Sequence, residues 1–97
     1  MANNLHVSYD LREPGRNYDR VIAAIKELGS WAKIHYSYWY VRSTLTSAQA
    51  RDAIMHTLDA NDSAYIVDAT NNDAAGHNIS SEASKFIRDQ WVGRAAA

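Results

Sequence analysis

Cysteine is absent from the 97-residue chain, proline occurs once and glycine only four times. Without cysteine the protein has no disulfide, no thiolate metal site and no cysteine nucleophile. A secreted domain of this size usually needs disulfides, so the composition favours a reducing cytoplasm. No apolar run approaches the roughly 20 residues that cross a bilayer, and the N-terminal residues do not resemble an export signal. We therefore expect a cytoplasmic protein that is neither exported nor membrane-spanning.

An excess of charge of either sign is also missing. Ten Lys and Arg side chains against eleven Asp and Glu leave a formal net charge of -1. The whole chain therefore has no electrostatic attraction for phosphates, and any nucleic-acid binding must come from a local patch. A chain of this length buries one hydrophobic core but not two, so we expect a single domain over residues 1–97.

The first third of the chain predicts a strand, a turn and a helix. Residues 5–11 alternate apolar and polar side chains with the period of a strand. Pro14 and Gly15 indicate a turn. Asn17 can cap a helix that ends at Gly29 and has an apolar stripe at Tyr18, Val21, Ile22, Ile25 and Leu28.

Residues 31–42 are rich in aromatic and β-branched residues and also alternate. About twelve residues exceed the usual strand length of about 5–6. We interpret them as two antiparallel strands joined tightly near Tyr36 and Ser37, or as one long bent ribbon. Further along, a capping box predicts a helix from Thr46, residues 64–70 predict a strand, and a polar loop precedes a final helix capped by Ser80 or Ser81.

The resulting order of elements is β-α-β-β-α-β with an additional C-terminal helix. It predicts an α+β fold of the ferredoxin-like type, in which two helices cover one face of a four-stranded antiparallel sheet. The core spans about residues 4–70, and the C-terminal loop and helix about 71–92. The other sheet face would expose aromatic side chains, so we expect either dimer formation or docking of the last helix. The aromatic residues assigned to the dimer interface are Tyr38, Trp39 and Tyr40.

The sequence contains no Gly-rich phosphate loop, HExxH, GxSxG or Walker motif. Among its histidines, only His6 with Asp10, or with His35 on a neighbouring strand, could converge on a metal. The alternative is that they are exposed or hydrogen-bonded sheet residues. His56 and His77 are expected at the surface.

Asp10 is a candidate catalytic residue and metal ligand, because it ends the first strand and is followed by arginines. A carboxylate there can hold a hard divalent cation while the arginines receive a nucleic-acid phosphate. Ser37 is also assigned to nucleic-acid binding. Two Asp10 side chains facing each other in a dimer would make a better Mg2+ site than one. Alternatively, Asp10 accepts hydrogen bonds from loop amides or pairs with an arginine. The candidate phosphate-binding arginines are Arg12, Arg16 and Arg20.

Four short segments resemble a known family over residues 5 to about 70. They are Ser8-Tyr9-Asp10-Leu11, Glu27-Leu28-Gly29, Ser37-Tyr38-Trp39 and Ala64-Tyr65-Ile66-Val67. The chain resembles the small CRISPR-associated adaptation endonucleases of the Cas-two type and the SinR-like proteins grouped with them. This resemblance implies a ferredoxin-like homodimer in which Asp10 of each chain binds Mg2+ for phosphodiester hydrolysis. It also implies that Ser37 and Trp39 belong to the hairpin motif of the family.

Two functional interpretations follow. The first is a homodimeric, Mg2+-dependent endonuclease acting on RNA or DNA. The second is a non-catalytic dimeric interaction module, either a regulator or a toxin–antitoxin component, that binds a protein partner. The near-neutral charge of the chain favours the second interpretation.

Overall fold

The structure, a computed structural model, describes residues 2–11 and 18–93. Its elements are β1 (Asn3–Asp10), α1 (Asp19–Lys26), β2 (Gly29–His35), β3 (Tyr38–Ser43), α2 (Ser47–Met55), β4 (Ser63–Asp68) and α3 (Ser81–Gln90). This succession confirms the predicted one, the last helix included. None of the helices in the described part of the chain has the length and apolar character needed to cross a membrane.

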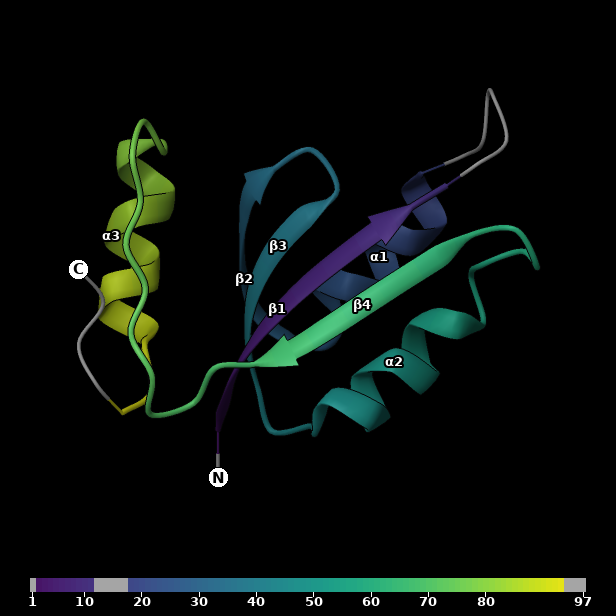
Figure 1. The fold of residues 1–97 in the computed structure, drawn as a ribbon, viewed down its shortest axis with the longest axis horizontal. Coiled ribbons are helices and arrows are strands. Elements are labelled where there is room, and N and C mark those ends of the chain that lie inside the picture. The colour runs from purple at the N-terminus through teal and green to yellow at the C-terminus, as the bar shows by residue number, and fades with distance from the viewer. Residues whose placement is uncertain (1, 12–17, 94–97) are drawn as a thin grey trace.

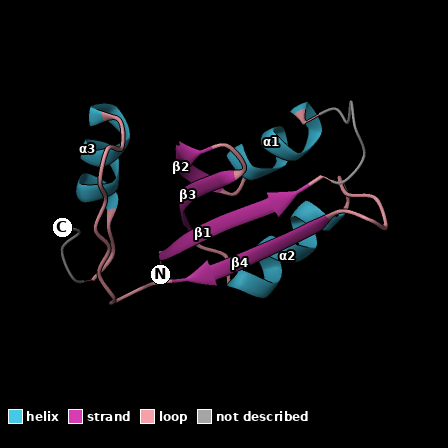
Figure 2. Cartoon of the chain, turned by 45° about the horizontal axis from the view of Figure 1, so that its top comes forward, coloured by secondary structure: helices cyan, strands magenta, loops and turns pink. Residues whose placement is uncertain are grey.

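The four strands form one antiparallel sheet in the order β2-β3-β1-β4. Figure 1 shows α1 and α2 behind this sheet, whereas α3 lies at the other side, next to β2. Figure 2 shows the same separation of α3 from the other two helices. The α+β class and the antiparallel sheet are therefore confirmed.

The aromatic segment after α1 is a hairpin. β2 and β3 pair antiparallel and are joined by Tyr36 and Ser37, at the predicted position, so the long-ribbon alternative is wrong. Ser37 adopts φ of 62°, a left-handed conformation that usually favours glycine. Its carbonyl accepts a hydrogen bond of 3.1 Å from the Tyr9 N–H, which ties the turn to β1. The absence of glycine made this turn hard to place from sequence.

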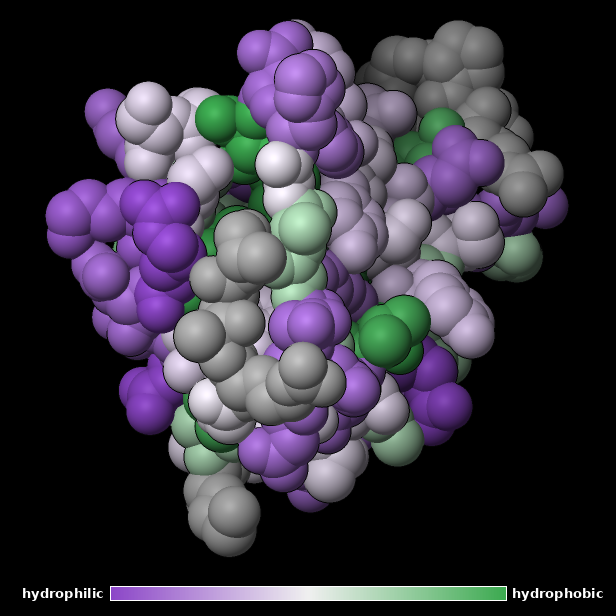
Figure 3. Space-filling view, turned by 60° about the vertical axis from the view of Figure 1, so that its left-hand side comes forward, coloured by the Kyte–Doolittle hydropathy of each residue, from purple (hydrophilic) through white to green (hydrophobic). Residues whose placement is uncertain are grey.

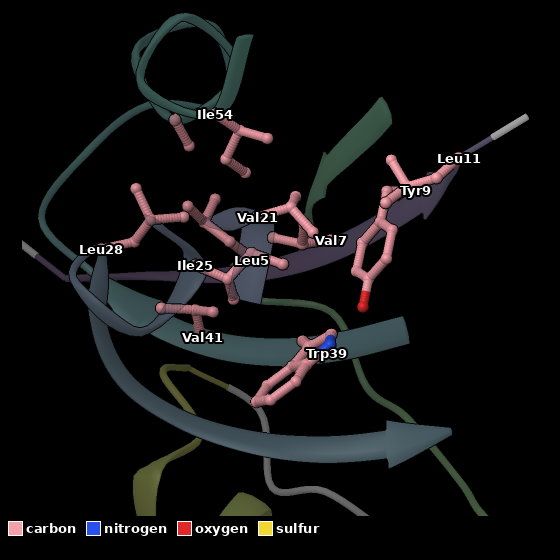
Figure 4. Close-up of a cluster of buried hydrophobic side chains, with 11 residues drawn as sticks. Leu5, Val7, Tyr9, Leu11, Val21, Ile25, Leu28, Trp39, Val41 and Ile54 are labelled. Atoms are coloured by element: carbon pink, nitrogen blue, oxygen red, sulfur yellow. The ribbon is translucent and has the colours of Figure 1, made fainter. Parts of the chain in front are cut away.

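The hydrophobic core lies between the sheet and the helices α1 and α2 (Figure 4). The alternating apolar side chains of β1 face it, as do Val21 and Ile25 of α1, and both patterns are those predicted. α2 begins with the predicted capping box, in which Thr46 and Gln49 exchange hydrogen bonds of 2.9 and 3.1 Å. The predicted turn at Pro14 and Gly15 and the cap at Asn17 lie outside the described residues. The core residues are Leu5, Val7, Tyr9, Leu11, Val21, Ile25, Leu28, Trp39, Val41, Ala50 and Ile54.

Trp39 belongs to this core and is only 2% exposed in the single chain. Its ring packs edge-on against Trp31 with centroids 5.4 Å apart, and the Lys26 ammonium lies 4.5 Å from the Trp31 centroid. Tyr38 and Tyr40 point to the opposite face, because side chains alternate along β3. The three aromatic residues therefore do not form one surface, and the burial of Trp39 is complete without a partner chain.

Residues 69–93, which we call the C-terminal lobe, return across the sheet face opposite the core. The lobe is anchored by Asn4, whose side chain is fully buried. The Asn4 Nδ2 donates to the Val92 carbonyl at 2.8 Å, and the Val92 N–H donates to Asn4 Oδ1 at 2.9 Å. The carboxamide thus bonds Val92 through one donor and one acceptor, as a neighbouring strand would. Tyr40 Oη adds a third bond to Asn4 Oδ1 at 3.0 Å.

Aromatic packing reinforces this anchor. The Tyr40 ring stacks on Trp91 with centroids 5.7 Å apart, and Phe86 of α3 approaches it edge-on at 6.4 Å. Trp91 Nε1 donates to the Asn72 carbonyl at 2.8 Å, and this bond links the first and last segments of the lobe. Gly93, with φ of +93°, lies so close to Asn71 that a Cβ would meet the Asn71 Oδ1 at 2.3 Å. Docking of the last helix, one of the two expected ways to cover this face, is therefore what the chain does.

Replacing Asn4 with alanine should release the lobe while leaving the core sheet folded. The substitution removes the partner of the Val92 N–H and one of the two donors to the Val92 carbonyl, which the Asn71 N–H also bonds. A buried group left unsatisfied costs about 1–3 kcal/mol. We expect the amide protons of α3 to exchange at least about tenfold faster in Asn4→Ala, with β1 and β3 still protected. Hydrogen exchange followed by NMR measures this. Asn72→Ala is the control, since Asn72 bonds Ala69 and Trp91 through its backbone groups. Equal α3 protection in Asn4→Ala and the parent would contradict the anchor.

Candidate functional site

The C-terminal lobe does not fill all the space above the sheet. A cavity of about 570 Å3 remains between them, within the range of about 300–1,000 Å3 typical of small-molecule sites. The sheet contributes one wall, and the loop before α3 together with α3 itself contributes the other. The lining residues are His6, Ile34, His35, Tyr38, Ala74, Ala75, Gly76, His77, Ile79, Ser84, Ile87 and Arg88.

His6 and Tyr38 make the polar part of the sheet wall. His6 Nδ1 and Tyr38 Oη are hydrogen-bonded at 2.7 Å. The His6 ring also lies 6.0 Å from Tyr40 and 5.8 Å from Trp91, both edge-on. Its Nε2 atom is buried and has no hydrogen-bond partner among the described residues. Burial lowers the pKa of His6 and raises the pKa of Tyr38, so both side chains are neutral near pH 7.

The outer part of the same wall is aromatic and its rim is basic. The His35 ring stacks on Tyr38 with centroids 6.3 Å apart and an interplanar angle of 26°. His35, His77 and Arg88 are all exposed at the cavity. Apolar lining comes from all parts of the cavity, through Ile34 of β2, Ile79 of the loop and Ile87 of α3. The cavity therefore combines an apolar interior, a neutral hydrogen-bonding pair and a basic rim.

Of the residues singled out from sequence, His6 and His35 are brought together. Both line the cavity and both contact Tyr38, which was assigned to a dimer interface. His77 is at the surface, as expected, but also lines the cavity. Within residues 2–11 and 18–93, no group of three or more potential His, Cys, Asp or Glu metal ligands is found.

Asp10 lies away from this cavity. It is exposed at the end of β1 and stands opposite Ser63 of β4, on the sheet face that also carries His6. Four residues of strand place its Cα about 13 Å from that of His6. Arg20 lies in the helical layer, where its Nη2 donates to the His56 carbonyl at 3.3 Å. The other two candidate arginines, Arg12 and Arg16, lie outside the described residues.

The remaining candidates differ in accessibility. Ser37 is half-buried in the hairpin turn, and its assignment to phosphate binding stays a prediction. Tyr40 is fully buried beneath the lobe, and burial raises its pKa to about 12. Its burial, like that of Trp39, is accounted for within one chain.

Sequence reasoning missed the contribution of the lobe to the site. Ser84, Ile87 and Arg88 come from α3, and none of them is among the candidate site residues of the sequence analysis. The three positions share one helix face by their spacing, which is the only sequence signal for them. Seen from the side of α3, the surface is largely hydrophilic, with hydrophobic residues between the polar ones (Figure 3).

We compared the chain with protein families, with characterised proteins and with solved structures, and none gives a significant match.

The buried state of His6 makes stability depend on pH. Because its folded-state pKa lies below the ordinary value of 6.5, the folded chain binds fewer protons than the unfolded chain just below that pH. The free energy of unfolding should therefore keep its highest value above about pH 6.5 and decrease as the pH drops below 6.5. In His6→Phe, which keeps an aromatic ring, the decrease in the free energy of unfolding at acid pH should be smaller.

Urea unfolding at about pH 7.5, 6.5 and 5.5 measures this dependence. The control is His56→Gln, because His56 is exposed and only its backbone is used. It should show the parental dependence on pH. If the free energy of unfolding of His6→Phe decreases at acid pH as much as that of the parent, His6 is not the cause of the decrease.

Proposed function

We propose that this protein is a ligand-binding domain of the ferredoxin-like type that holds a small molecule between its sheet and its C-terminal lobe. The order β-α-β-β-α-β, the strand order β2-β3-β1-β4 and the placement of α1 and α2 on one face support that fold assignment. The cavity of about 570 Å3 is the observation that carries the function.

Its lining suits a ligand better than it suits a packing defect. A packing defect is small and apolar, because protein interiors are filled to the density of organic crystals. Here the lining includes six polar side chains, contributed by three strands, a loop and a helix. Binding sites combine apolar walls with a few convergent polar groups in this way. The function is therefore reversible binding, and it depends on the lobe being docked.

Filling the cavity should abolish binding. Ser84 is half-buried on α3 and faces the cavity, so Ser84→Trp should occupy part of it. We expect the neutral fluorescent probe N-phenyl-naphthylamine to bind the parent saturably and the variant at least about tenfold more weakly. The matched control is Lys85→Trp, on the exposed side of the same helix, where only an ion pair with Asp89 is lost. Failure of the parent to bind, or equal binding by Ser84→Trp, would refute the cavity as the site.

A second candidate is the Mg2+-dependent nuclease formed by a homodimer. It is favoured by the part of the sheet face that the lobe leaves open, where Asp10 is exposed and Tyr65 and Val67 of β4 are 73% and 45% exposed. An aromatic ring beside a carboxylate could stack a base near a bound cation. The same open face would suit a second copy of the chain, or the protein partner of a non-catalytic interaction module.

If this candidate is right, the chain should cleave RNA or DNA oligonucleotides with Mg2+ and not with EDTA. Asp10→Asn keeps the shape of the side chain but removes the charge that a hard cation needs, so cleavage should be lost. Asp52→Asn, on the exposed face of α2, should cleave like the parent. Gel assays, with light scattering to detect the dimer, measure both. An inactive parent, or an active Asp10→Asn, would reject the nuclease.

A further inference from the structure

We propose that the molecule bound in the cavity is an organic anion with a flat, apolar body and an acidic group, such as a carboxylate or a phosphate, at one end. The inference rests on the proposed binding function and specifies its ligand. It follows from how apolar, neutral and basic groups are distributed over the cavity wall.

The body of the ligand is specified by the inner walls. Ile34 and Ile87 supply aliphatic surface from the sheet and from the helix, so an apolar group gains from leaving water there. The rings of Tyr38 and His35, inclined by only 26°, continue this surface on the sheet side as an aromatic wall that runs outward to the rim. Aromatic pairs favour stacked or edge-on geometry, which a flat ring system satisfies better than a branched aliphatic chain does.

The inner polar pair does not provide a charge for an acid. His6 and Tyr38 are bonded to each other, and burial keeps both neutral. A carboxylate placed against them would be buried without a cation, and burying an unpaired charge is costly. They suit a neutral part of the ligand instead.

The acid is specified by the rim. Arg88 lines the cavity together with His35 and His77, and none of the described residues that line it carries a carboxylate. Asp89, the next residue along α3, pairs instead with Lys85, whose Nζ lies 2.7 Å from Asp89 Oδ2. A guanidinium binds carboxylates and phosphates through two parallel hydrogen bonds, so Arg88 is the group that would hold the acid. The ligand would therefore lie with its apolar end inward and its acid at Arg88.

A matched pair of probes tests this orientation. Anilinonaphthalene sulfonate is N-phenyl-naphthylamine with a sulfonate group added, so the two share an aromatic body and differ in charge. A hydrogen bond to a charged partner corresponds to about tenfold or more in affinity. We expect the sulfonate to bind the parent at least about tenfold more tightly, and this preference to fall below about threefold in Arg88→Gln. Arg51→Gln, on the exposed face of α2, should keep the parental preference.

The outcomes separate the two proposals. If neither probe binds the parent saturably, the binding function itself fails. If both bind with equal affinity and Ser84→Trp weakens both, the cavity stands as a site and the anion inference is overturned. A sulfonate preference that survives Arg88→Gln, or sulfonate binding that survives Ser84→Trp, also overturns the inference, because the charge would then be recognised elsewhere.

Discussion

The buried carboxamide of Asn4 holds the two parts of this molecule together. It sits in the central strand β1, bonds Tyr40 of β3, and binds both backbone groups of Val92 after α3. A buried amide group without a partner costs about 1–3 kcal/mol, so the docked arrangement depends on these bonds being made. The cavity lies between the docked lobe and the sheet. The cavity therefore depends on docking of the lobe, to which Asn4 contributes together with the aromatic contacts of Tyr40.

The strand β3 carries large aromatic side chains on both faces of the sheet, so each face has a buried layer. Trp39 enters the core with α1 and α2, whereas Tyr40 lies under the lobe and Tyr38 borders the cavity. A chain of 97 residues thereby buries large rings on both sides of a strand without a second subunit. The lobe covers β2, β3 and part of β1, and it leaves Tyr65 of β4 exposed.

The parts of this fold that sequence could predict are local. Alternation in β1, the apolar stripe of α1, the capping box at Thr46 and the turn at Tyr36 and Ser37 each depend on neighbouring residues, and each is present in the structure. Asn4 gave no such signal, because its partners Tyr40 and Val92 lie 36 and 88 residues away. The cavity could not be predicted from the sequence for the same reason. Its walls meet only after the lobe has crossed the sheet.

The neutral interior and the anchored lobe are consequences of the same burial. The Trp91 ring packs on both His6 and Tyr40, so the contacts that dock the lobe also exclude water from the imidazole and keep it uncharged. A ligand in the cavity would touch the sheet and the lobe at once and would bind only the docked form. By mass action it would add its binding free energy to that of docking. Binding of the ligand and docking of the lobe would then be coupled, and both would depend on how stably residues 69–93 pack on the sheet.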